Sequence, residues 1–269
     1  HCGVRGDPPR PSGPEPLRRR SATHCGVGAR RHLTPPMERP AIVFDLDGVL
    51  VDTEPLKLRA HRAAVEARGG ELGAELYRRE MGNAHEGVVR AFLEASGLAA
   101  GPEAVAAYEE IFRSAYRRLL SRELEPAAGA PDVLRACREE DRPLALVTSS
   151  DRWMVEIVLP RLGAEDAFRA VVTAQDVEAE KPSPDPYLRA RSALGRRGDA
   201  AVAVEDTRSG VASAAAAGLP VVAVRHAFNR GRAFDEAAAV VESLSPASSF
   251  LELVDRVARG VQTPDEASR

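Results

Sequence analysis

Short apolar runs alternate with helical stretches through most of the chain, and this alternation limits the fold more than any other feature of the sequence. The runs are rich in Val and Ala, and stretches with helical spacing of apolar residues separate them. Near-continuous apolar strands that alternate with helices are typical of a parallel sheet covered by helices on both faces. The chain is therefore predicted to be an α/β protein with a doubly wound parallel sheet. The expected strands are Ala41–Phe44, Leu144–Ser150 with the turn that ends it, Ala170–Asp176, Ala200–Thr207, Pro220–His226 and a short one near 239–243.

One block of sequence breaks the alternation after the first strand. From Leu56 to Glu125 only helical patterns occur, and Pro126 and Pro131 then frame a hinge-like stretch. We interpret this block as an all-α lobe inserted into the sheet domain and joined to it by two linkers. The expected division is a helical domain at 55–126 and a core domain made of 40–54 and 127–269.

Residues 1–39 precede the first strand and have a different composition. Residues 1–36 hold seven Arg and two acidic residues among many Pro and Gly, without periodicity, which is typical of disorder. Because Met37 stands just before the first strand, residues 1–39 are interpreted as a disordered leader or a misassigned extension. An Arg-rich, acid-poor segment is also consistent with a transit peptide, which would give an organellar location.

The charge and cysteine content argue against several classes of protein. The net charge is −3 and the isoelectric point is near 6.1, so the sequence predicts no nucleic-acid or membrane surface. The three cysteines lie far apart, which favours a reducing compartment over a disulfide framework. We expect a cytoplasmic protein that is a monomer or a weak homodimer and has no nucleic-acid or membrane partner.

Polar side chains follow the ends of the expected strands. In open parallel sheets, ligands bind beyond the carboxyl ends of the strands, so residues far apart in sequence meet at one edge of the sheet. A lysine in the connection after the third strand belongs to the same edge. The set is Asp45, Asp47, Thr148, Ser149, Lys181, Glu205 and Asp206.

The acidic members of this set suit a divalent cation. Asp45, Asp47 and Asp206 would repel one another at one sheet edge unless a cation compensates their charge. Magnesium prefers oxygen ligands and is commonly held by one or two carboxylates together with substrate phosphate. Gly48, which follows directly, permits a close approach between the backbone and a ligand. The sequence therefore predicts a Mg²⁺ site.

The remaining members suit a phosphate group. A hydroxyl at Thr148, backbone N–H groups near Ser149 and the ammonium of Lys181 together form a phosphate cradle. The chain has only two lysines, Lys57 and Lys181, against a large number of arginines, which suggests that a compact ammonium is needed at these positions. A metal site beside a phosphate cradle and a further carboxylate indicates phosphoryl transfer, with an aspartyl-phosphate as one known route.

Four short blocks occur in the order DLDGV, VTSS, KPSPDPY and VEDTRSG. Together they resemble the haloacid dehalogenase-like superfamily over about residues 40–228. The chain looks like the subgroup with a helical cap, which includes small-molecule phosphatases and β-phosphoglucomutase. The resemblance implies a Rossmann-like core, a cap formed by the inserted lobe, and a Mg²⁺-dependent phosphatase that hydrolyses a small phosphorylated metabolite, by default a sugar phosphate.

The resemblance also implies roles for individual residues. Asp45 would attack phosphorus and form an aspartyl-phosphate. Asp47 would give a proton to the leaving oxygen and later take one from water. Thr148 and Lys181 would hold the phosphoryl group, helped by N–H groups near Ser149.

The implied metal ligands are the Asp45 carboxylate, the backbone carbonyl of Asp47 and the Asp206 carboxylate. Glu205 would lie beside the metal, either as a further ligand or behind the ligands. Relatives that cleave carbon–halogen or phosphonate bonds lack an acid at the Asp47 position, so Asp47 argues against both activities.

Three residues of the lobe are candidates for substrate contact: Lys57, Asn83 and His85. For Lys57 a solvated helix face is the favoured interpretation, and for His85 a surface or helix N-terminal position is favoured over substrate contact. The mutase pattern has His where Lys57 stands and Arg where Ala84 and His85 stand, so hydrolysis is preferred and a sugar-phosphate mutase is the alternative. A non-catalytic phospho-ligand binder is the alternative from another class, but such proteins usually lose an acid from the first block.

Overall fold

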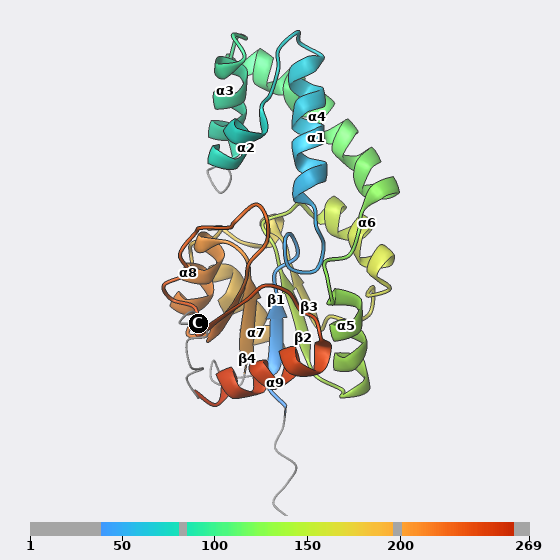
Figure 1. The fold of residues 1–269 in the computed structure, drawn as a ribbon, viewed down its shortest axis with the longest axis vertical. Coiled ribbons are helices and arrows are strands. Elements are labelled where there is room, and N and C mark those ends of the chain that lie inside the picture. Colours follow the sequence, from blue (N-terminus) through green and yellow to red (C-terminus); the bar gives the residue numbers. More distant parts are fainter. Residues whose placement is uncertain (1–38, 81–84, 196–200, 261–269) are drawn as a thin grey trace, which may run out of the picture. The chain divides into compact units, whose positions relative to one another are not determined.

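The computed structural model describes residues 39–80, 85–195 and 201–260. Its centre is one parallel sheet of six strands in the order β3-β2-β1-β4-β5-β6. The predicted α/β class with a doubly wound parallel sheet is confirmed (Figure 1). The strands are β1 (Ala41–Phe44), β2 (Leu144–Val147), β3 (Ala170–Val172), β4 (Ala201–Glu205), β5 (Val221–Val224) and β6 (Ala239–Val241).

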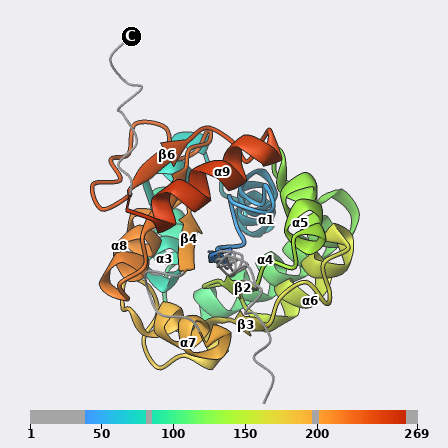
Figure 2. The same cartoon turned by 90° about the horizontal axis from the view of Figure 1, so that it is seen from below.

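The two faces of the sheet carry side chains of different size because successive residues of a strand point to opposite faces. Ile42 and Phe44 of β1 pack on the face covered by α5 (Ala130–Glu139), α6 (Arg152–Leu162) and α9 (Ala247–Ala258). Ala41 and Val43 pack on the opposite face, against α7 (Asp185–Leu194) and α8 (Arg208–Ala216). Figure 2 shows α9 and α7 on opposite sides of the strands. Both faces are thus buried, as the near-continuous apolar runs indicated.

Three strands are shorter than the sequence predicted: β4 and β5 each end two residues before the expected 207 and 226, and β3 is shortened most. The expected strand 170–176 ends at Val172 and continues into a short 3-10 helix, η1 (Ala174–Asp176). The Asp176 carboxylate accepts hydrogen bonds from the backbone N–H and the hydroxyl of Thr173, at 2.8 and 2.7 Å. This local cap competes with strand pairing and ends β3 early.

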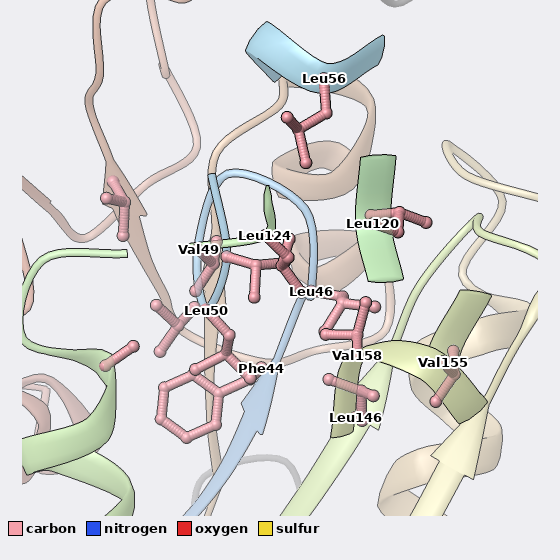
Figure 3. Packing of buried hydrophobic residues seen from close by; sticks show 14 of the residues in the cluster. Phe44, Leu46, Val49, Leu50, Leu56, Leu120, Leu124, Leu146, Val155 and Val158 are labelled. Atoms are coloured by element: carbon pink, nitrogen blue, oxygen red, sulfur yellow. The ribbon is translucent and has the colours of Figure 1, made fainter. Parts of the chain in front are cut away.

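Four helices lie between β1 and α5 in the sequence: α1 (Glu54–Glu66), α2 (Ala74–Glu80), α3 (His85–Ala95) and α4 (Pro102–Glu123). The longest two, α1 and α4, pack against each other and each has proline in its first turn, where no intrahelical N–H bond is lost. The side chains of Leu56 in α1 and Leu120 in α4 belong to the same buried cluster as Phe44 of β1 (Figure 3). The lobe is therefore anchored in the core by the two helices that enter and leave it. No helix within the described ranges has the length and apolar character needed to cross a membrane.

The topology leaves a crevice at one place in the sheet. From β1 the chain proceeds to β2 and β3 on one side, and then returns to β4, β5 and β6 on the other. The connections after β1 and β4 therefore diverge at the carboxyl ends of these strands, which is where open α/β sheets bind ligands.

Candidate active site

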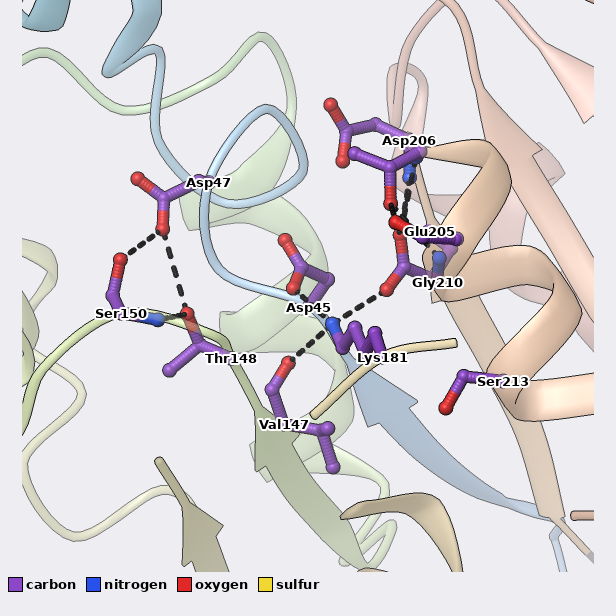
Figure 4. Close-up of polar contacts among 12 residues, drawn as sticks. Asp45, Asp47, Val147, Thr148, Ser150, Lys181, Glu205, Asp206, Gly210 and Ser213 are labelled. Carbon is purple, nitrogen blue, oxygen red and sulfur yellow. Dashed lines mark hydrogen bonds and ion pairs between the residues drawn. The ribbon is translucent and has the colours of Figure 1, made fainter. Parts of the chain in front are cut away.

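Carboxylates from two adjacent strands meet at this crevice. Asp45 follows β1, Glu205 ends β4 and Asp206 comes next. The Asp45 N–H donates to the carbonyl of Val204 at 2.9 Å, which continues the β1–β4 ladder up to the site. Carboxylate oxygens of Asp45, Glu205 and Asp206 lie within 4.8 Å of one another, and all three side chains are buried (Figure 4).

Lys181 supplies the positive charge inside this cluster. Its Nζ lies 2.6 Å from Asp45 Oδ1 and 2.6 Å from Glu205 Oε1, and it also donates to the carbonyl of Val147 at 3.2 Å. All three ammonium hydrogens are therefore engaged. Burial lowers the pKa of Lys181, but Asp45 and Glu205 raise it by more, so the ammonium is charged. The predicted phosphate ligand thus also fixes the carboxylate of Asp45.

Glu205 is the most deeply anchored of the three acids. Its Oε1 accepts from Lys181 and from the Tyr187 hydroxyl at 2.7 Å, while its Oε2 accepts from the N–H groups of Asp206 and Thr207 at 3.0 and 3.2 Å and from the Thr207 hydroxyl at 3.1 Å. A Cβ on Gly210 would lie about 2 Å from this carboxylate, so the glycine of VEDTRSG makes room for it. With both oxygens saturated by donors, Glu205 fits a supporting position behind the ligands better than metal coordination.

Asp206 differs from Glu205 because one of its two carboxylate oxygens accepts no hydrogen bond from the described residues. Oδ2 lies 2.8 Å from Nε2 of His226, whereas Oδ1 is buried and has no hydrogen-bond partner in the described part of the chain. Burial raises the pKa of both Asp45 and Asp206, and nearby carboxylates raise each further. An oxygen-only donor set with an unpaired buried carboxylate oxygen fits a hard divalent cation, which would restore the charged forms.

The side chain of Asp47 lies apart from the acidic cluster. Its Oδ1 is 2.5 Å from the Thr53 hydroxyl and 2.9 Å from Lys57 Nζ, and its Oδ2 accepts from the Ser150 hydroxyl at 2.7 Å. Burial raises the pKa of Asp47, but Lys57 and the hydrogen bonds of Thr53 and Ser150 outweigh it and bring the pKa to about 2. Asp47 is thus a carboxylate held by donors on three sides, and its side chain is not placed with Asp45 and Asp206.

The favoured interpretation of Lys57 as a solvated helix face is wrong. Its side chain is only 23% exposed, and its ammonium pairs with both Asp47 and Glu54. Lys57 lies in the first turn of α1 and lines the cavity, so the side of the helix that carries it faces the site and not solvent. This lysine therefore joins the helical lobe to the loop that carries the acids.

The turn after β2 places Ser150, which the sequence interpretation overlooked, beside Asp47. Thr148 is buried, accepts from the N–H of Ser150 at 3.0 Å, and lies 3.4 Å from Asp47 Oδ2. Ser149 is exposed at the cavity wall, while the neighbouring Ser150 turns inward to Asp47. The sequence VTSS alone does not show which of the two serine side chains faces inward, because either backbone position is compatible with the pattern. Tyr187 and His226 were also missed, although Tyr187 belongs to the KPSPDPY block.

Gly48 occupies a position that no other residue fits well. Its φ is +79°, and a Cβ there would lie 2.3 Å from Asp206 Oδ2. Both the backbone conformation and the close approach of the carboxylate therefore require glycine. The close approach at Gly48 is made by the carboxylate of Asp206, and the expected approach of a ligand stays a prediction.

A cavity of 840 Å³ lies between these residues and the lobe. Its wall includes the predicted residues Asp45, Asp47, Lys57, His85, Thr148, Ser149, Lys181 and Asp206. His85 begins α3, and its Nε2 lies 2.7 Å from Glu109 Oε1, so it is both a helix N-terminal residue and part of the wall. Asn83 lies outside the described residues.

Comparison with known proteins identifies the family. Residues 42–224 match the model of the haloacid dehalogenase-like hydrolases. The phosphorylated carbohydrates phosphatase of Thermotoga maritima is 32% identical over 201 residues, which cover 74% of this chain and 92% of that protein. The fructose-1-phosphate phosphatase YqaB of Escherichia coli is 30% identical over 184 residues, covering 68% of this chain and 95% of that protein.

Solved structures agree with this assignment. The CbbY protein of Rhodobacter sphaeroides, solved with phosphate, has a TM-score of 0.71 at 26% identity and covers 80% of this chain and 99% of its own. A structure titled putative β-phosphoglucomutase from Thermotoga maritima has a TM-score of 0.66 at 28% identity, covering 82% and 98%. The chain belongs to the haloacid dehalogenase-like hydrolases, in the subgroup with a cap. The predicted enzyme class, a phosphoric monoester hydrolase, is confirmed.

Proposed function

We propose that this enzyme is a magnesium-dependent phosphatase that removes phosphate from a small phosphorylated carbohydrate. The observation that carries the proposal is the buried, unpartnered Oδ1 of Asp206 beside the carboxylate of Asp45, at the wall of a cavity that also holds Lys181. The relatives named for phosphorylated carbohydrates and fructose 1-phosphate support the substrate class.

The residues that would hold Mg²⁺ are Asp45, Asp206 and the backbone carbonyl of Asp47. When bound, the ion offsets the negative charge of the carboxylates and of the phosphoryl oxygens. Glu205 keeps Lys181 and the backbone after β4 in place through the hydrogen bonds it accepts.

We assign the role of nucleophile to Asp45. Lys181 fixes Oδ1, while Oδ2 accepts no hydrogen bond from the residues that the structure describes. A bond forms between a carboxylate oxygen of Asp45 and phosphorus while the bond from phosphorus to the sugar oxygen breaks. Thr148, Lys181 and the backbone N–H groups near Ser149 hold the phosphoryl oxygens, so that stabilisation of charge carries most of the catalysis.

Asp47 gives the proton that the leaving oxygen needs. Water then attacks the aspartyl-phosphate, Asp47 takes the proton of that water, and inorganic phosphate leaves with Asp45 restored. Because Lys57 and two hydroxyls hold the pKa of Asp47 at about 2, withdrawal of Lys57 from Asp47 would favour proton donation. Movement of α1 with the lobe would provide this step.

The helical lobe, residues 55–126, would act as the cap over the core domain of residues 40–54 and 127–269. Closure would expel water from the cavity and shape the pocket for the leaving group, and opening would release the product. Lys57 and His85 are the described lobe residues at the wall that we expect to contact the sugar.

A phosphate-release screen over phosphorylated sugars and small acids, with and without Mg²⁺, tests the function. We expect Mg²⁺-dependent release that Asp45→Asn abolishes, while Asp132→Asn, a change at an exposed carboxylate, leaves it intact. Release by Asp45→Asn at the wild-type rate would refute the nucleophile. Conversion of β-glucose 1-phosphate to glucose 6-phosphate without free phosphate would instead identify a mutase.

A further inference from the structure

His226, in the loop after β5, contacts the acidic cluster but belongs to none of the four sequence blocks. Its Nε2 lies 2.8 Å from Asp206 Oδ2. Its other ring nitrogen, Nδ1, accepts a hydrogen bond from the N–H of Phe228 at 3.2 Å. The ring hydrogen therefore sits on Nε2, and the histidine donates to the carboxylate.

The loop that carries His226 is built around Asp206 by a second residue. Asn229 is buried, and its Nδ2 donates to the carbonyls of Asp206 and Val224, both at 2.9 Å. Its Oδ1 accepts from the N–H of His226, also at 2.9 Å. The backbone of Asp206 and the position of the histidine are thus tied to the same amide side chain.

These contacts make the two oxygens of Asp206 unequal. Oδ2 is occupied by His226, and a Cβ on Gly48 would lie 2.3 Å from Oδ2 and 3.0 Å from His226 Nε2. The histidine–carboxylate pair therefore lies directly against the α-carbon of Gly48, which limits rotation of the carboxylate. Oδ1 is buried and has no hydrogen-bond partner among the described residues. It belongs to the same carboxylate cluster as Asp45.

We propose that His226 is a positioning residue for the cation site: it holds Asp206 so that Oδ1 is presented to the metal. The inference rests on the proposed Mg²⁺ site. Hydrogen bonds to metal-ligating carboxylates fix their orientation, and loss of such a partner typically weakens metal binding by about 10- to 100-fold. Asp206 acts as the ligand, and His226 acts only through it.

A purely structural role, in which His226 only fills space in the loop, makes a different prediction. His226→Phe keeps a ring of similar size but removes the donor, whereas His226→Gln keeps an N–H donor at a similar reach. If positioning matters, the glutamine variant retains metal affinity and the phenylalanine variant loses it. If only packing matters, the order of the two variants is reversed or their affinities are equal.

The experiment is calorimetric titration of MgCl₂ into the full-length, metal-free protein without substrate, with thermal unfolding of each variant as a check of folding. We expect His226→Phe and His226→Ala to bind Mg²⁺ about 10- to 100-fold more weakly, and His226→Gln to bind within a few-fold of wild type. If His226→Phe or His226→Ala binds Mg²⁺ with wild-type affinity while Asp206→Asn does not bind it, the positioning role of His226 is refuted and the metal site stands. Unchanged binding in Asp206→Asn would overturn the metal site itself, and this inference with it.

Discussion

Lys57 of α1 and Asp47 of the loop after β1 form an ion pair, with Nζ 2.9 Å from Oδ1, that joins the helical lobe to the acid proposed to handle the proton. The ion pair has two effects, one on the lobe and one on the protonation of Asp47. It holds the lobe against the core, and it keeps Asp47 deprotonated. Under the proposed mechanism, this ion pair would couple the position of the lobe to the protonation of Asp47.

Replacing Lys57 should move the pH dependence of the reaction upward. Burial raises the pKa of Asp47, and Lys57 is the largest of the influences that bring it down to about 2. Without the ammonium, the pKa of Asp47 should rise by about one to three units. The limb of kcat/KM that falls as Asp47 loses its proton should shift to higher pH in Lys57→Met.

Lys57→Arg, which keeps the charge, is the matched control and should leave the limb near its wild-type position. kcat/KM is the right quantity because it reports the ionisation of the free enzyme. An unchanged limb in Lys57→Met would show that the ion pair does not control the proton on Asp47.

Lys181 is expected to be essential to stability as well as to activity. Its side chain is 6% exposed and bridges two carboxylates that are themselves buried. Lys181→Met would leave these charges unpaired, at a cost of about 3–5 kcal/mol in the free energy of unfolding. Urea unfolding in the absence of metal measures this loss.

The comparison that isolates the pair is a double-mutant cycle. Adding Glu205→Gln to Lys181→Met should recover part of the lost stability, because the second change removes one unpaired charge. Arg59→Met, which breaks an ion pair with Glu123 at the surface, should change stability little. Additive losses in the double variant would contradict a coupled buried pair.

The sequence predicted the fold and the meeting of Asp45 with Asp206, though not the separate position of the Asp47 side chain, for one physical reason. Asp45 and Asp206 directly follow buried strands, and parallel pairing brings strand ends to the same edge whatever the loops do. β3 was predicted too long because Asp176 caps Thr173 locally, a contact between neighbours that an apolar pattern does not encode.

Residues on turns could not be assigned in this way. Whether Ser149 or Ser150 faces Asp47 depends on the hydrogen bond from the Ser150 N–H to Thr148. Likewise, His226 reaches Asp206 only because Asn229 shapes its loop. Lys57 was misassigned because the rotation of α1 above the DLDG loop is set by packing of the lobe and not by helical periodicity.

The two serines after Thr148 provide a sharp test of this geometry. Ser150 donates to Asp47 Oδ2 at 2.7 Å, whereas the side chain of Ser149 is exposed. Because this hydrogen bond orients the carboxylate of Asp47, Ser150→Ala should lower kcat by about tenfold, even though its loss also raises the pKa of Asp47. Ser149→Ala keeps the backbone N–H proposed to bind phosphate and should have little effect. Steady-state kinetics in which Ser149→Ala is the more damaging change would contradict the placement of these side chains.

His61 in α1 should make the protein less stable in mild acid. It is 5% exposed, its Nδ1 lies 2.6 Å from the Tyr108 hydroxyl, and its ring stacks on Phe112. Burial, followed by the positive influence of His85 and Lys57, lowers the pKa of His61 from 6.5 to about 3. The folded protein therefore keeps this ring neutral at a pH where the unfolded chain protonates it.

The sign follows from proton linkage. Above pH 6.5 neither state binds a proton at His61, and the group adds no pH dependence. As the pH falls from 6.5 toward 3, only the unfolded chain gains the proton, so the free energy of unfolding drops by up to about 1.4 kcal/mol per pH unit. His61→Gln should flatten this slope in urea unfolding curves recorded across the interval. Equal slopes in wild type and His61→Gln would show that His61 takes up its proton in the folded state as readily as in the unfolded chain.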